Sequence, residues 1–65
     1  MVEIERTLDV VRLSVLRSVL TDAGIDNFVF DAAAGALWTG AIPSRLMVRD
    51  EDLELARRAI DQAGL

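Results

Sequence analysis

Arginine is the residue type with the most chemistry to offer in this 65-residue chain. Histidine, cysteine, tyrosine and lysine are absent, so all seven basic residues are arginines. This composition excludes the usual zinc and haem sites, Cys–His and Ser–His–Asp nucleophiles, and Schiff-base chemistry. The remaining guanidinium, hydroxyl and carboxylate groups include no general base of near-neutral pKa. We therefore expect no catalytic residues, no metal site and no cofactor, and a protein that is not an enzyme.

Anion binding is the chemistry that the arginines favour. Backbone amides at the start of a helix, the positive end of its dipole and arginine forks together bind phosphate or carboxylate groups. Around the start of the first predicted helix we expect the fold to gather five candidate ligand-binding residues, namely Arg6, Thr7, Arg12, Ser44 and Arg45. The alternative is that these arginines pair with Glu5, Asp9 or Asp31, as surface ion pairs that contribute little to stability.

The first strand and first helix follow from the hydropathy pattern. Residues 2–8 alternate, which predicts a half-buried strand with Glu3, Glu5 and Thr7 on its polar side. Asp9 stands at the N-cap of a helix predicted over residues 10–23, and Gly24 ends that helix. Its wide apolar stripe, into which Arg12 also points, comprises Val11, Leu13, Val15, Leu16, Val19, Leu20 and Ala23.

The rest of the chain predicts two more strands and a second helix. Residues 25–31 form a second strand, and residues 45–49 form a third, with Pro43 before its start. The acidic run at 50–52 caps a second helix that Gly64 ends. The pattern is βαββα, an α+β, ferredoxin-like fold with the fourth strand missing. Right-handed crossovers predict a three-stranded antiparallel sheet in the order first–third–second, with two helices on one face. The whole chain, residues 1–65, is expected to be one domain.

Small size and apolar surface predict association. A domain of about 60 residues buries only about 60% of the surface of its unfolded chain, and no disulfide stabilises this one. The first strand would keep an unpaired edge where the fourth strand is missing. Phe28, Phe30 and Met47 are expected on the uncovered side of the sheet, together with Glu3 and Glu5. We therefore expect a homo-oligomer whose interface includes these three apolar residues.

Residues 32–44 form an uncharged link of thirteen residues, longer than most connections. One interpretation is a regulatory or partner-binding loop. The other is a short helical turn whose Trp38 fills a gap against the sheet or a neighbouring subunit. In both cases Trp38 is a candidate interface anchor, because tryptophan is enriched at such positions.

The charge of −4 and the pI near 4.5 argue against nucleic acid and anionic membranes as partners. The alternating, acidic start of the chain is unlike a signal peptide. No apolar run approaches the roughly 20 residues that a membrane span needs. We expect a cytoplasmic protein.

Several sequence blocks together resemble one bacterial family. They include Arg6-Thr-x-Asp9, Asp22-Ala-Gly-Ile25, and the stretch IPSRLMVRDED over residues 42–52. The chain resembles, over nearly its whole length, the putative prokaryotic signal-transducing proteins, a small domain-of-unknown-function family. That family is named for its fold similarity to the ferredoxin-like PII nitrogen regulators. The resemblance implies a regulatory module without defined catalytic residues. The tyrosine and lysine positions through which PII proteins are modified and bind effectors are missing here.

The sequence as a whole indicates a non-enzymatic signal-transducing or regulatory module. It would bind a small anionic effector or a protein partner, and would work as an oligomer. The alternative is a plain protein-interaction or assembly subunit that binds no ligand.

Overall fold

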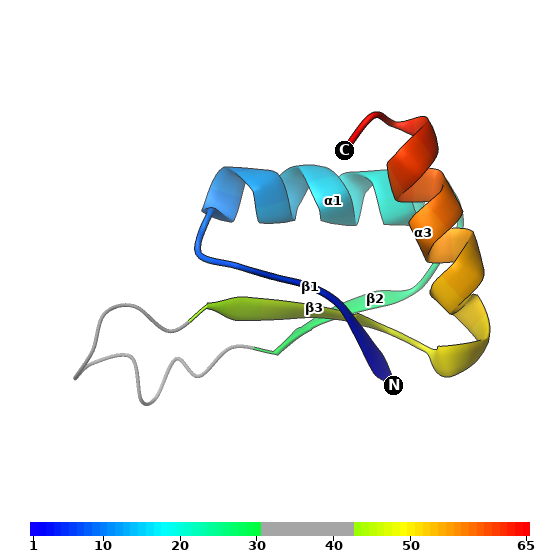
Figure 1. Cartoon of the computed structure of the whole chain (residues 1–65), viewed down its shortest axis with the longest axis horizontal. Coiled ribbons are helices and arrows are strands. Elements are labelled where there is room, and N and C mark those ends of the chain that lie inside the picture. The colour runs from blue at the N-terminus through cyan, green and yellow to red at the C-terminus, as the bar shows by residue number, and fades with distance from the viewer. Residues whose placement is uncertain (31–42) are drawn as a thin grey trace.

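The strands and helices follow one another in the predicted order, in a computed structural model that describes residues 1–30 and 43–65 (Figure 1). Its elements are β1 (Val2–Thr7), α1 (Val10–Asp22), β2 (Asn27–Phe30), β3 (Ser44–Val48), a 3-10 turn (Asp50–Asp52) and α3 (Leu53–Gln62). The βαββα pattern is therefore confirmed.

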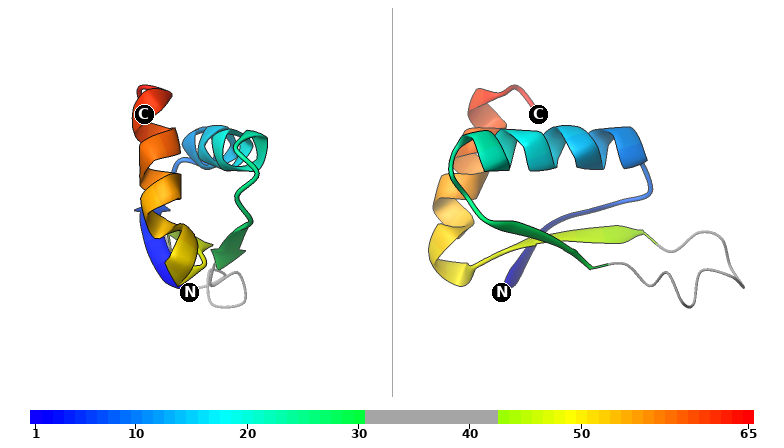
Figure 2. Two further views of the ribbon diagram at one scale, coloured as in Figure 1. Left: turned by 90° about the vertical axis from the view of Figure 1, so that its right-hand side faces the viewer. Right: turned by 180° about the vertical axis from the view of Figure 1, so that it is seen from behind.

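The three strands form one antiparallel sheet in the predicted order β1-β3-β2. Both helices lie on the same side of this sheet, with α1 along it and α3 steeply inclined at one end (Figures 1 and 2). In this ferredoxin-like arrangement α1 connects β1 to β2, which are not neighbours in the sheet, and α3 follows the central strand β3. The other side of the sheet carries no described helix.

The core lies between the sheet and the helices. Leu46 and Val48 come from the central strand β3, and both are fully buried. They pack against two leucines of α1, against one residue that follows α1 and against one residue of α3. The buried apolar residues are Leu16, Leu20, Ile25, Leu46, Val48 and Ala56. Burial of these side chains is the main source of stability in so small a domain.

The predicted apolar stripe of α1 is only partly buried. Leu16 and Leu20 are fully buried, but Val11 remains 72% exposed and Val15 41% exposed. Successive residues of a helix are separated by about 100°, so turning the two leucines onto the sheet turns Val11 to the opposite side. The prediction that Val11 and Val15 face the sheet is therefore wrong.

Each end of α1 is set by local hydrogen bonds. Asp9 is its N-cap, as predicted, and the Asp9 carboxylate accepts two backbone amides of the first turn. At the other end Gly24 adopts φ +75°, and the amide of Ile25 donates to the Leu20 carbonyl. A left-handed glycine with this bond is a common helix ending, because glycine has no Cβ to clash.

The start of the second helix differs from the prediction. Asp50–Asp52 form a 3-10 turn, and neither this turn nor α3 has a side-chain capping hydrogen bond. The Asp50 carboxylate instead accepts the amino group of Met1 at 3.0 Å. The acids remain at the positive end of the helix dipole, but Asp50 connects the start of β1 to the turn rather than capping a helix. No helix in residues 1–30 or 43–65 is long and apolar enough to cross a membrane.

Candidate functional site

A β-bulge in β1 decides which of its side chains face the helices. Consecutive residues of β3 lie opposite Glu3 and Glu5, so β1 carries one extra residue, Ile4. Glu5 lies opposite Leu46, which is buried under the helices, and Glu5 therefore points to the helix side. Arg6 consequently points to the uncovered side. The prediction that Glu5 shares the uncovered side with Glu3 is wrong, because the inserted residue reverses the alternation.

Glu5 meets Arg12 of α1 on the helix side of the sheet. Arg12 donates from Nε to one carboxylate oxygen and from Nη2 to the other, the second bond being 2.9 Å long. These hydrogen bonds lower the pKa of Glu5, against a weaker opposing effect of burial. The bond to Glu5 likewise raises the pKa of Arg12. The position of Arg12 in the apolar stripe is thus explained by a partner on the sheet.

The N-terminus of α1 is occupied by its own cap. Asp9 Oδ1 accepts the amides of Val11 at 3.0 Å and Arg12 at 3.1 Å. The hydroxyl of Thr7 accepts the amide of Asp9 at 3.0 Å. Two of the backbone amides that we expected to hold an anion are therefore already satisfied by a carboxylate of the same chain.

The uncovered side of the sheet, which we call the open sheet face, carries two rows of side chains. One row crosses the strands as Glu3, Met47 and Phe28, and the next as Arg6, Arg45 and Phe30. Phe28, Phe30 and Met47 thus lie on the predicted side of the sheet. Their role at an interface stays a prediction.

Two arginines lie directly opposite each other on this face. Arg6 of β1 is the register partner of Arg45 on the central strand, and Arg45 has Phe30 as its neighbour on β2. Like charges in directly opposite positions of a sheet destabilise it. Arg6 is partly compensated by Glu3, whose Oε1 lies 2.9 Å from Arg6 Nη2. The bulge makes this pair possible, since it places residues three apart on the same face of the strand.

A third arginine extends the open sheet face at its other end. Arg49 Nη1 lies 2.7 Å from the carboxylate of Asp26, and the Arg49 guanidinium lies 5.9 Å from the centre of the Phe28 ring. Such stacking of a cation on an aromatic face is favourable. The open sheet face thus carries three positive groups, Arg6, Arg45 and Arg49. Its two negative groups are Glu3 and Asp26, so the net charge of the face is +1. The chain as a whole has a charge of −4.

The five predicted ligand-binding residues lie on two sides of the sheet. Arg6 and Arg45 belong to the open sheet face, whereas Arg12 reaches Glu5 on the helix side. Thr7 and Ser44 are opposite each other and are also on the helix side. Anion binding by these residues stays a prediction. The residues form two separate groups, one on each side of the sheet, so they cannot all hold the same anion. Trp38 and most of the 32–44 link lie outside the described residues.

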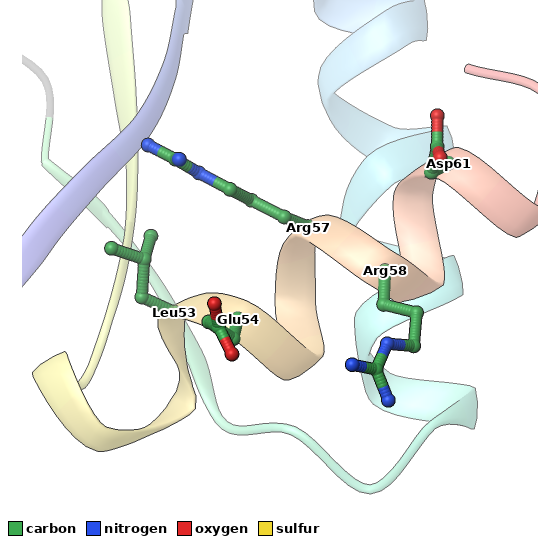
Figure 3. Close-up of a pocket in the computed structure, with 5 residues that line it drawn as sticks. All are labelled: Leu53, Glu54, Arg57, Arg58 and Asp61. Carbon is green, nitrogen blue, oxygen red and sulfur yellow. The ribbon is translucent and has the colours of Figure 1, made fainter.

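A surface pocket lies along the exposed side of α3 and is lined by Leu53, Glu54, Arg57, Arg58 and Asp61 (Figure 3). The guanidinium groups of Arg57 and Arg58 point away from each other (Figure 3). Two acids balance the two arginines, so the pocket has no net charge to select an anion. Within the described ranges, no group of three acidic side chains lies close enough together to hold a metal ion.

Comparison with known families gives one result. The sequence model of a family described as "putative prokaryotic signal transducing protein" matches residues 1–64. The chain belongs to this family. No curated protein and no solved structure matched it. This member of the signal transducing family has the half-ferredoxin fold described above, and fold by itself does not determine function.

Proposed function

We propose that this chain is a non-enzymatic cytoplasmic regulatory module that acts as an oligomer. Its open sheet face would bind a carboxylate or phosphate group carried by a small effector or by a protein partner. The opposition of Arg6 and Arg45, with Phe30 alongside, is the observation that carries the proposal. The family description supports a signalling role.

An anion between the two arginines would remove an unfavourable interaction. Directly opposite residues of a sheet have Cβ atoms about 4.5–5.5 Å apart, so both forks can reach one bound group. Arginine forks match the planar geometry of carboxylates and the oxygens of phosphate. Phe30, which is 42% exposed, offers an apolar contact next to the charge. The face is therefore suited to an anionic group attached to an apolar body.

The helix N-terminus is a weaker choice for the same ligand. Asp9 fills its amides, and Arg12 is already bound to a carboxylate. An incoming anion would have to displace both Asp9 and Glu5. On the open sheet face an anion would compete with Glu3 for Arg6, but it would not have to displace a helix cap. We therefore place the ligand on that face.

A thermal-shift screen of nucleotides and carboxylated or phosphorylated metabolites tests this function. We expect at least one compound to raise the melting temperature of the native chain, and Arg45→Gln to abolish that rise. Arg58→Gln, an exposed arginine of α3, is the matched control and should keep the full shift. If Arg45→Gln keeps the shift, or if no compound produces one, ligand binding on this face is contradicted.

A second candidate is an assembly subunit without a ligand. It is favoured by the uncharged outward side of α1, where Val11 is 72% exposed. This alternative predicts no hit in the screen and a change of molecular mass on substitution of α1.

A further inference from the structure

The side of α1 that faces away from the sheet is uncharged along most of its length. We call it the outer α1 face and define it by Val11, Ser14, Val15 and Ser18. All four residues are exposed. Viewed along its axis, α1 has the sheet below it and α3 on one side, and no other described element covers its outward side (Figure 2).

The apolar surface continues to the first residue of the helix and into the segment that precedes it. Val10 and Leu8, at the N-terminal end of the outer α1 face, are 73% and 63% exposed. A surface helix normally carries its polar residues on the side opposite the core. A group of exposed aliphatic side chains in a small domain marks an interaction surface.

Both arginines of α1 are held away from this face by contacts within the chain. Arg12 binds Glu5 on the sheet, and Arg17 Nε lies 2.9 Å from the side-chain oxygen of Asn27 at the start of β2. Asp22, in the last turn, is the third charged residue of the helix. About two turns of helix, residues 11–18, therefore present only valine and serine outward, and Asp22 follows on the same side of the helix one turn later.

We infer that two copies of the chain associate through the outer α1 face, with the two helices packed antiparallel about a two-fold axis near Ser14 and Val15. This inference rests on the oligomer part of the proposed function and names the contact surface. Copies that each carry −4 repel one another, so they meet most favourably where neither presents charge. The exposed side of α3 has four charged residues and the open sheet face has three arginines.

The antiparallel arrangement follows from the helix dipole and from Asp22. Parallel helices would bring together like ends of the two dipoles and the two Asp22 carboxylates. In the antiparallel pair these groups lie at opposite ends of the contact. The serines allow the helix axes to approach closely while the valines fill the space between them. A symmetric contact of this kind uses the same residues on both copies.

Sedimentation equilibrium on the native chain and two variants tests the surface. The native chain should reach twice the 7.1 kDa of one copy. Val11→Asp should raise the dissociation constant by about tenfold or more, because it buries a charge at the contact. Leu55→Asp should leave the dissociation constant within about twofold of the native value. Each variant places an aspartate in the first turn of a helix, where it favours folding, and Leu55 is exposed like Val11.

Two outcomes would overturn the inference in different ways. A native chain that stays monomeric over the whole concentration range removes both this surface and the oligomer part of the proposed function. A dimer that Val11→Asp does not weaken removes this surface alone and leaves oligomer formation standing. Circular dichroism of both variants shows whether α1 remains folded.

Disulfide formation tests the direction of the helices, since the native chain has no cysteine. Ser14→Cys places its thiol near the two-fold axis, and we expect oxidised chains to link into dimers. Asp22→Cys should not link, because an antiparallel pair holds these positions roughly 20 Å apart at 1.5 Å per residue. Linking of Asp22→Cys at the rate of Ser14→Cys would contradict the antiparallel contact.

Discussion

Glu5 and Arg12 connect the sheet to the helix layer through a two-pronged ion pair, 2.9 Å long at its Nη2 branch. Simple alternation along β1 would place Glu5 on the other side of the sheet. The extra residue at Ile4 turns the Glu5 carboxylate toward α1 and turns Arg6 outward. One irregularity of the backbone therefore creates both the internal ion pair and the excess of arginine on the open sheet face.

The Glu5–Arg12 pair makes stability depend on pH in the acid range. Because the pKa of Glu5 in the folded chain is below its ordinary value of 4.5, its contribution is complete above that value. The contribution is lost as the pH falls through the lowered pKa. Glu5→Gln should therefore reduce stability at neutral pH and flatten the decline in stability below about pH 4.5.

Urea denaturation at a series of pH values measures this difference. Glu54→Gln serves as the control, since Glu54 is an exposed residue of α3, and it should keep the native slope. Equal slopes for the native chain and Glu5→Gln would show that the pair does not contribute.

Reversing one charge on the open sheet face should stabilise the chain in the absence of ligand. Arg45→Glu replaces the like-charge opposition to Arg6 with an opposite-charge pair, a change of about 0.5–1 kcal/mol. Chemical denaturation at low and high salt measures it. The gain should shrink at about 1 M salt, where exposed charges are screened. A loss of stability at low salt would contradict the assigned register.

The sequence pattern was sufficient for the elements but not for the bulge. Alternation over residues 2–8 predicts a strand, and β1 is one, but the pattern cannot show that β3 pairs with one residue fewer. No glycine marks the irregularity. The available signal was Arg12, a charge in an apolar stripe, which required an acidic partner on the sheet. The sequence offered Glu5 among the possible partners of the arginines, and assigning it to Arg12 would have placed Glu5 on the helix side and revealed the bulge.

The position of the apolar stripe was also only partly predictable. Valine and leucine occur around most of α1, so hydropathy alone does not determine which side is buried. Packing decides it, because Leu16 and Leu20 fit against Leu46 and Val48 of the central strand. Val11 then faces outward.

Truncating the central strand should have the largest effect on stability. Leu46→Ala removes a fully buried side chain, which costs about 2–5 kcal/mol. A domain of this length has a total stability of roughly 3–10 kcal/mol, so much of it would be lost. Leu55→Ala, at an exposed position, should stay within about 0.5 kcal/mol. Thermal and urea unfolding measure both, and similar losses would show that the core is misplaced.

The glycine that ends α1 should resist substitution for a conformational reason. Gly24 has φ +75° and no atom within 4 Å of where a Cβ would stand. The cost of Gly24→Ala is therefore backbone strain, about 1 kcal/mol, rather than a steric clash. Gly24→Asn should cost less, because asparagine tolerates this conformation better. Equal stabilities of the native chain and Gly24→Ala, by urea denaturation, would contradict the left-handed helix ending.

Cross-strand nuclear Overhauser contacts between β1 and β3 test the bulge most directly. With the bulge, Arg6 should show backbone contacts to Arg45, and Glu5 to Leu46. Without it, Glu5 would contact Arg45 and Arg6 would contact Ser44. The first set would place the two arginines opposite each other on the open sheet face. The second set would return Glu5 to that face and contradict both the ion pair with Arg12 and the proposed anion site.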